Sequence, residues 1–274
     1  MEKEEFYSEK EIISAITRFK NASKRGDNCY FDIYEYEGII DYFFDNDNIN
    51  NASKAIDNAC AQHPGSISLK MRKAQLFVYN GEADHALEIL NNIDDLESNN
   101  SDLLFLTGNA LLLRDKPDEA EKQFARLIEV EIEDYEGTLF DIANACELCD
   151  YKEMALKYYN KYLAIHPYSK KVWNIVANIY FDNNDIEKAL IAYDYAIAID
   201  PEFPEAILGK ANGLILNKKY KEALISLFDY QKLQPEDLHV NSYLGECYLH
   251  LGDFDEAVKY FGKIIDKDNK PGAN

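Results

Sequence analysis

The chain repeats one pattern of small and large residues about every 34 residues, and this constrains its fold more than any other feature. In residues 170–203, alanines stand at Ala177, Ala189 and Ala196, and Pro201 follows them. Counted from the first residue of this range, they occupy positions 8, 20, 27 and 32. Self-similarity at a fixed period of this length is typical of a solenoid of stacked repeats. Seven units tile residues 33–271, and one of them has an extra residue: 33–66, 67–100, 101–135, 136–169, 170–203, 204–237 and 238–271.

Each unit is predicted to form two helices, called A and B. Apolar residues recur at the i, i+3, i+4, i+7 spacing of an amphipathic helix. A polar or glycine-containing turn near positions 13–16, such as FDNNDI at 181–186, separates the two helices. Prolines near position 32 end helix B, because proline has no N–H for the helical ladder. In the unit 136–169 an aromatic, Tyr151, stands one place before position 17, where an aromatic is expected, which predicts a tighter or shifted turn there.

The small residues explain how the helices pack. A small side chain at positions 8 and 20 lets helices A and B approach closely, and position 27 does the same toward the next unit. The substitution Ala189→Leu should overpack its hairpin and cost about 1–3 kcal/mol. The predicted fold is therefore all-α.

This pattern resembles the tetratricopeptide repeat (TPR) family, whose Trp, Leu-Gly, Tyr, Ala, Phe and Pro signature is matched best by residues 170–203 and 238–271. The resemblance covers about nine tenths of the chain. It implies a right-handed superhelical solenoid of about seven helix-turn-helix hairpins. It also implies that the chain binds other proteins, with the A helices lining a concave groove.

The two ends differ from the repeats. Residues 1–32 are predicted to hold a capping helix and a linker, since solenoids need their terminal faces covered. The last helix B should carry an apolar face, and two explanations stay open for it. The chain continues in a longer protein, or this edge meets a partner or a second copy through Phe261, Ile264 and Ile265.

Charge limits the classes of partner. The chain has 274 residues and a formal net charge of −21. Phosphate backbones and anionic membranes attract clustered Lys and Arg, so neither nucleic acid nor a membrane surface is expected as a partner. A neutral or basic protein segment fits better. The charged start of the sequence and the absence of a long apolar run predict a cytoplasmic protein.

No motif for chemistry stands out. The sequence has no phosphate-binding glycine loop, no HExxH and no GxSxG. Cys146 and Cys149 form a lone CxxC, whereas a structural zinc site would need two further ligands. Cys146 is interpreted as a core residue. We expect no enzymatic activity, no cofactor and no metal.

The A helices carry the candidate binding residues. Position 9 holds an amide in five successive units, and an amide side chain can both donate and accept hydrogen bonds. Such a row could bind the backbone of an extended peptide, with apolar anchors at position 5; it could equally be structural. We predict a non-enzymatic protein-interaction scaffold, with a peptide-sensing module or a self-assembling piece as alternatives. The predicted groove residues are Gln75, Asn109, Asn144, Asn178 and Asn212 at position 9, and Phe105, Phe140, Asn174 and Leu208 at position 5.

Overall fold

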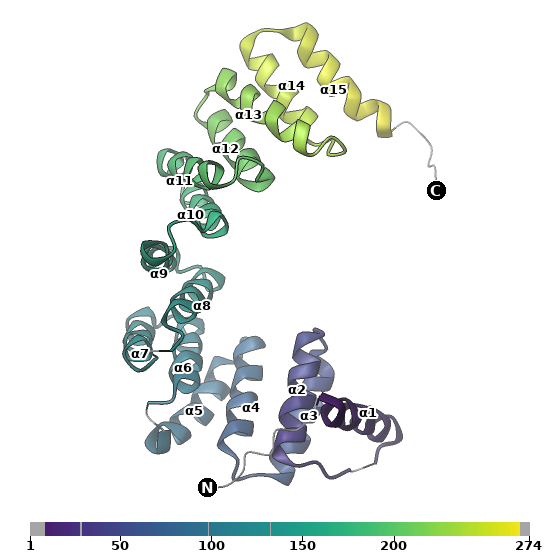
Figure 1. Cartoon of the computed structure of the whole chain (residues 1–274), viewed down its shortest axis with the longest axis vertical. Coiled ribbons are helices and arrows are strands. Elements are labelled where there is room, and N and C mark those ends of the chain that lie inside the picture. The colour runs from purple at the N-terminus through teal and green to yellow at the C-terminus, as the bar shows by residue number, and fades with distance from the viewer. Residues whose placement is uncertain (1–8, 28, 98, 132, 269–274) are drawn as a thin grey trace. The chain divides into compact units, whose positions relative to one another are not determined.

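The computed structural model describes residues 9–27, 29–97, 99–131 and 133–268. This part of the chain contains fifteen α-helices and no strand. It forms two compact units, residues 1–138 and 139–274, and the boundary between them falls within α8 (Figure 1). The all-α fold of about seven helix-turn-helix hairpins is confirmed.

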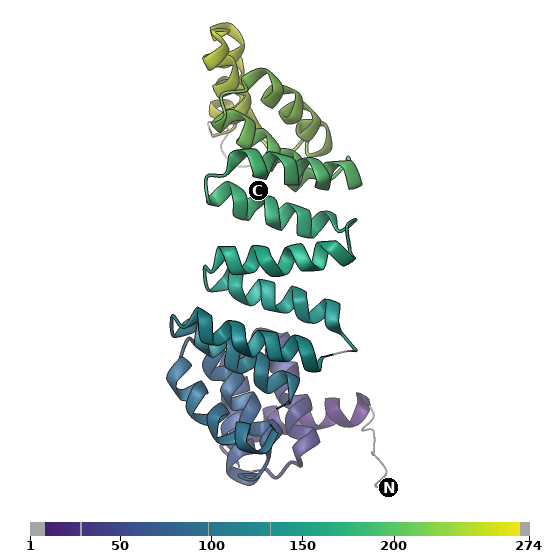
Figure 2. The same ribbon diagram turned by 90° about the vertical axis from the view of Figure 1, so that its left-hand side faces the viewer.

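The helices follow the predicted order. In the first compact unit, α1 (Glu9–Arg25) precedes three A–B pairs: α2 (Ile33–Asp45) with α3 (Ile49–Gln62), α4 (Ile67–Tyr79) with α5 (Ala83–Glu97), and α6 (Ser101–Leu113) with α7 (Pro117–Val130). Four pairs follow, of which the first spans the boundary: α8 (Tyr135–Leu148) with α9 (Lys152–Ile165), α10 (Lys170–Asp182) with α11 (Ile186–Ile199), α12 (Pro204–Leu216) with α13 (Tyr220–Leu233), and α14 (Val240–Leu251) with α15 (Phe254–Asp268). Figure 2 shows the teal and green helices of the second unit lying in successive layers.

The turn between helices A and B has the same backbone conformation in every hairpin. Its residue at position 15 has a positive φ, and the N–H of position 16 donates to the carbonyl of position 11 at 2.7–3.0 Å. This is a Schellman-type helix end, in which one left-handed residue reverses the chain. The residues with positive φ at position 15 are Asp47, Gly81, Asp115, Asp150, Asn184, Lys218 and Gly252.

The prediction of a tighter turn at Tyr151 is wrong. The Tyr151 N–H donates to the Cys146 carbonyl at 2.8 Å, as the corresponding residues do elsewhere. Helix α9 begins at Lys152, which is position 17, and helix B begins at position 17 in every other hairpin too. The backbone conformation sets the length of this turn, and the aromatic side chain only occupies the residue before the helix.

Small residues allow close packing within the hairpins. Ala177, Ala189 and Ala196 are all fully buried. Position 8 also lies under the side chain at position 24: a Cβ added to Gly108 would come within 2.3 Å of the Phe124 ring. In the last hairpin the ring of Phe261 covers Gly245 in the same way. The Phe261 ring therefore packs inside its own hairpin, and the residue is partly buried.

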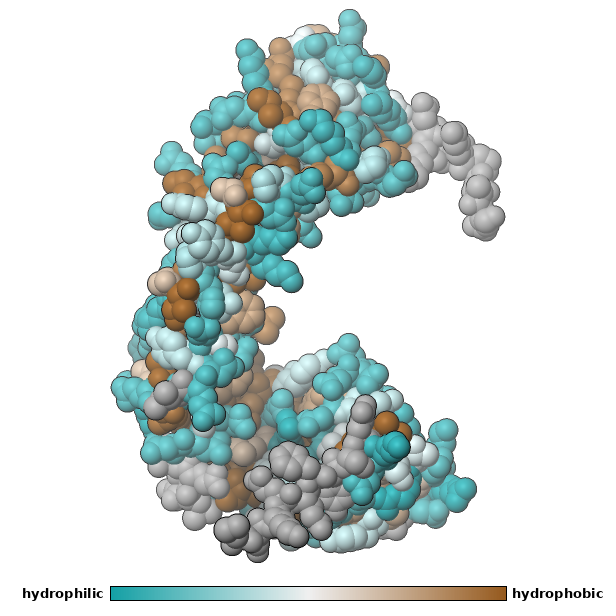
Figure 3. Space-filling view, in the orientation of Figure 1, coloured by the Kyte–Doolittle hydropathy of each residue, from teal (hydrophilic) through white to brown (hydrophobic). Residues whose placement is uncertain are grey.

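The terminal helices differ in how they are covered. Helix α1 buries Ala15, Ile16 and Phe19 against the first hairpin, and the Phe19 and Phe43 rings lie 5.8 Å apart. Helix α15 exposes Phe254, Val258 and Ile265, the last by 59%. Figure 3 shows apolar side chains scattered among many hydrophilic ones on the face turned to the viewer.

Candidate binding surface on the A helices

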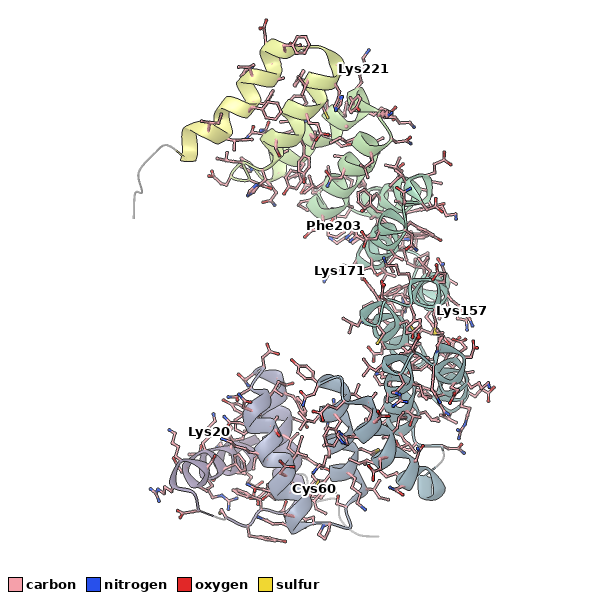
Figure 4. The ribbon with its side chains drawn as sticks, turned by 180° about the vertical axis from the view of Figure 1, so that it is seen from behind. Lys20, Cys60, Lys157, Lys171, Phe203 and Lys221 are labelled. Carbon is pink, nitrogen blue, oxygen red and sulfur yellow. The ribbon has the colours of Figure 1, made fainter. Side chains whose placement is uncertain are left out.

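The predicted groove residues lie on five A helices, α4, α6, α8, α10 and α12. Positions 5, 9, 12 and 13 fall on one side of a helix at 100° per residue, and positions 4, 7 and 11 fall on the opposite side. Figure 4 shows that in the second compact unit Lys171, on an A helix, and Lys157, on a B helix, point away from each other. Asn178 is exposed, and the other eight predicted residues are partly buried.

Two of the asparagines are held by tyrosines. The hydroxyl of Tyr193 donates to Asn178 Oδ1 at 2.7 Å. The Tyr159 hydroxyl lies 2.5 Å from Asn144 Oδ1 and 2.6 Å from a carboxylate oxygen of Glu147. Both tyrosines stand at position 24 of helix B and are buried, and burial raises the pKa of Tyr193 to about 12. Each carbonyl oxygen is therefore turned toward helix B.

The other two asparagines at position 9 have no such partner. In their hairpins position 24 is Phe124 or Leu227, neither of which carries a hydroxyl. The Oδ1 atoms of Asn109 and Asn212 are nevertheless buried, and they accept no hydrogen bond from the described residues. The same is true of Asn174 Oδ1, one helical turn before Asn178.

The orientation of the carbonyl oxygens determines which atom is available for binding. In Asn109, Asn144, Asn174 and Asn212 the Nδ2 group donates to no described residue and is not among the buried polar atoms. These side chains therefore direct a donor, not an acceptor, toward solvent. The sequence predicted the row, but it did not predict that the row offers N–H groups.

Gln75 differs from the asparagines. Its Oε1 accepts from Arg72 Nη1 at 3.1 Å, and Arg72 also forms an ion pair with Asp41 at 2.8 Å. Burial raises the pKa of Asp41, while Arg72 lowers it. This part of the first compact unit is a small charged network, so Gln75 is already engaged.

The aromatic residues at position 5 partly serve packing. The Phe105 ring lies 6.4 Å from the Phe124 ring, and Phe140 lies 6.0 Å from Tyr159 and 5.5 Å from Tyr162. Leu208, the third apolar residue at this position, packs against the core of the last hairpins. Each keeps part of its surface accessible, so their role as anchors stays a prediction.

Residues at position 13 are more exposed than those at position 5. Leu148 is 88% exposed and Leu216 is 57% exposed, and both end an A helix of the second compact unit. Asp182 occupies the same position in α10, the A helix between them in sequence. The sequence signal for this set was present in its spacing, but its exposure depends on how the helices pack.

The cysteines behave as core or partly buried thiols. Cys146 is fully buried, as predicted, and Cys149 is partly buried. Among the described residues no three His, Cys, Asp or Glu side chains are grouped so that they could hold a metal ion. In the same part of the chain, no helix is long and apolar enough to cross a membrane.

Comparison with known proteins identifies the type of repeat in this chain. A family model described as "Anaphase-promoting complex, cyclosome, subunit 3" matches residues 182–264. The C-terminal part of a TPR repeat-containing protein from Cytophaga hutchinsonii has a similar structure, with a TM-score of 0.64 and 16% identity. The match covers 85% of this chain and 95% of that one. The chain is a TPR protein.

Two curated relatives also resemble this TPR protein. Anaphase-promoting complex subunit 3 of Schizosaccharomyces pombe is 22% identical over 72% of this chain and 30% of its own length. The TPR repeat-containing protein YpiA of Bacillus subtilis is 24% identical over 40% of this chain and 26% of its own length. The TPR protein thus matches less than a third of either relative.

Proposed function

We propose that this TPR protein is a non-enzymatic scaffold that binds an extended segment of a partner protein along its A helices. The proposal is carried by the outward-facing amide donors of Asn144, Asn174 and Asn212 in the second compact unit, together with the exposed Asn178. An extended backbone has carbonyl oxygens pointing to alternate sides. A row of side-chain donors can bind such carbonyls without reading the side chains of the segment.

The surroundings of the donors favour a neutral or basic segment with apolar side chains. Leu148 and Leu216 offer exposed apolar contacts, and Asp182 places a carboxylate at the corresponding position of α10. Some TPR proteins bind an acidic C-terminus through a carboxylate clamp that uses a lysine at position 5. No A helix of this chain has a lysine there. The net charge of −21 further disfavours nucleic acid.

A fluorescence-polarisation screen of labelled extended peptides tests the proposal. Basic, neutral and acidic peptides are titrated with the wild type and with Asn178→Asp and Asn212→Asp. Each substitution keeps an acceptor oxygen toward helix B and replaces the outward donor with a charged acceptor. The Tyr193 hydroxyl keeps its partner in Asn178→Asp, so the fold should be retained.

The matched control is Asn160→Asp, which adds the same charge on an exposed part of the B helix α9. A neutral peptide should bind the wild type and Asn160→Asp alike. It should bind the two groove variants at least about tenfold more weakly, since each lost hydrogen bond to a peptide is worth about 1 kcal/mol and the new carboxylate repels peptide carbonyls. Equal binding by all four proteins would contradict the proposal, as would the lack of any bound peptide.

A further inference from the structure

A second surface lies on the opposite side of the A helices. In the first compact unit, α3, α4 and α5 enclose an open cleft of about 630 Å³, whose rim includes Cys60, labelled in Figure 4. Its described walls come from positions 28, 31 and 32 of one repeat and from both helices of the next, at positions 4, 7, 11, 19, 22, 23, 26 and 27. This α3–α5 cleft does not include any of the predicted groove residues.

Two lysines create the α3–α5 cleft. Lys70 and Lys73 stand at positions 4 and 7 of helix A, where most other repeats place large apolar side chains such as Trp173 and Val176. Phe77, Ile89 and Ile93 provide apolar lining around them. A hydrophobic contact between adjacent repeats is thus replaced by an open, partly charged recess.

The two lysines differ in their partners. Lys73 Nζ forms an ion pair with Asp57 on α3 at 3.1 Å, and the Asp57 side chain is 62% exposed. Lys70 is exposed and has no ion pair with any described residue. Among the described residues of the lining, Glu88 is the one carboxylate. Lys70 therefore supplies an unpaired positive charge beside apolar side chains.

A related cleft in the second compact unit provides an internal comparison. There α11, α12 and α13 enclose about 360 Å³, and Lys210 at position 7 pairs with Asp194 at 2.6 Å. Asp194 and Asp57 occupy the same position 25 of the preceding repeat. Position 4 is Ile207, however, and the other lysine in the lining of the α11–α13 cleft, Lys232, pairs with Asp229 at 2.8 Å.

We propose that the α3–α5 cleft is a binding site for an acidic peptide segment in which a glutamate or aspartate lies between apolar residues. Lys70 binds the carboxylate, Lys73 contributes a second charge, and the apolar side chains contact Phe77, Ile89 and Ile93. Charge complementarity selects this occupant, because the site offers an ammonium group without an ion-pair partner among the described residues. The site is independent of the A-helix groove.

The test uses a labelled peptide with a central Leu-Glu-Leu and Gly-Ser flanks, and the same peptide with Leu-Gln-Leu. The protein variants are Lys70→Gln/Lys73→Gln, Lys210→Gln as the matched position-7 control, and Lys54→Gln as an exposed control on α3. Thermal unfolding establishes that each variant is folded. The groove variant Asn212→Asp is included to separate the two proposed sites.

The wild type should bind the glutamate peptide at least about tenfold more tightly than the glutamine peptide, because a charge-assisted hydrogen bond is stronger than a neutral one. The double variant should lose this preference, and the affinity of the wild type should fall at high salt. Lys54→Gln, Lys210→Gln and Asn212→Asp should bind as the wild type does. Equal affinity for the two peptides, no binding, or the same loss in Lys210→Gln would overturn the proposal.

Discussion

At the scale of single residues, the side chain at position 24 decides the state of the asparagine at position 9. Tyr193 provides a hydroxyl for Asn178, and Leu227 leaves the oxygen of Asn212 buried without a partner. An unpaired buried polar atom destabilises the folded state, because it has given up its hydrogen bonds to water. Neighbouring asparagines that look equivalent in the sequence therefore contribute differently to stability.

This difference predicts opposite results for two alanine substitutions. Asn178→Ala leaves the buried Tyr193 hydroxyl without its hydrogen-bond acceptor and should lower the free energy of unfolding by about 1–3 kcal/mol. Asn212→Ala removes an unsatisfied oxygen and should leave stability unchanged or raise it. Urea denaturation measures both, and in a Tyr193→Phe background the cost of Asn178→Ala should shrink. Equal losses at the two sites would contradict the hydrogen-bond assignment.

The repeated turn gives a second prediction for a single residue. Lys218 has a φ of 58°, a conformation that costs an L-residue about 1–2 kcal/mol and costs glycine little. Lys218→Gly should therefore raise the free energy of unfolding, by up to about 1 kcal/mol after the greater freedom of the unfolded chain is counted. Its neighbour Lys219 has a φ of −87°, so Lys219→Gly should give no such gain in the same denaturation experiment.

The sequence predicted where the polar row lies, but not how its members point. Position 9 follows from the period of the repeat, which fixes the face of helix A. The direction of each amide depends on a hydrogen bond to the residue at position 24 of another helix, and on the packing of that side chain. The sequence shows that position 24 carries a hydroxyl in Tyr159 and none in Phe124 or Leu227. This difference predicts the direction of the amide only when positions 9 and 24 are known to be in contact.

At the scale of helices, the fit between positions 8 and 24 controls the spacing within a hairpin. Gly108 lies under Phe124, whereas Ala211 stands in the hairpin that has Leu227. Gly108→Ala should cost about 1–3 kcal/mol by forcing the ring away. The double variant Gly108→Ala/Phe124→Leu should lose less stability than the sum of the losses in the two single variants, because the smaller side chain at position 24 makes room for the added methyl group. Strict additivity in thermal or urea unfolding would show that the two residues do not share one contact.

The loop between α13 and α14 is stabilised by hydrogen bonds to the Asp237 carboxylate, which predicts that the free energy of unfolding depends on pH. Asp237 Oδ2 accepts from the Tyr230 hydroxyl at 2.7 Å, and Oδ1 accepts from the His239 N–H at 2.9 Å. The Tyr230 hydrogen bond is the main reason that the pKa of Asp237 is lowered. The contribution of Asp237 is therefore complete above the unfolded pKa of about 4 and is lost as the pH falls through the lower folded value.

Unfolding of the wild type and Asp237→Ala between about pH 7 and pH 3 measures this contribution. The wild type should be the more stable at neutral pH, and its advantage should shrink toward the acid end. A stability difference that stays constant over this range would show that the ionised carboxylate does not matter.

At the scale of the whole molecule, the 34-residue period predicted the all-α repeat fold because each unit buries its apolar face only against its neighbours. It did not predict that residues 1–138 and 139–274 form separate compact units, or that the boundary falls within α8. Compactness depends on how tightly successive hairpins pack. The recess beside Lys70 and Lys73 shows how two polar residues at core positions can change such an interface.

If the A helices offer amide donors to an extended backbone, a bound peptide must change the surroundings of those amides. Two-dimensional NMR of the asparagine side-chain amides in ¹⁵N-labelled protein measures this, with and without a peptide found in the screen. The Nδ2 resonances of Asn144, Asn178 and Asn212 should shift on binding, and those of Asn160 and Asn183 should stay in place. Bound peptide that leaves the first three resonances unmoved would contradict the proposal.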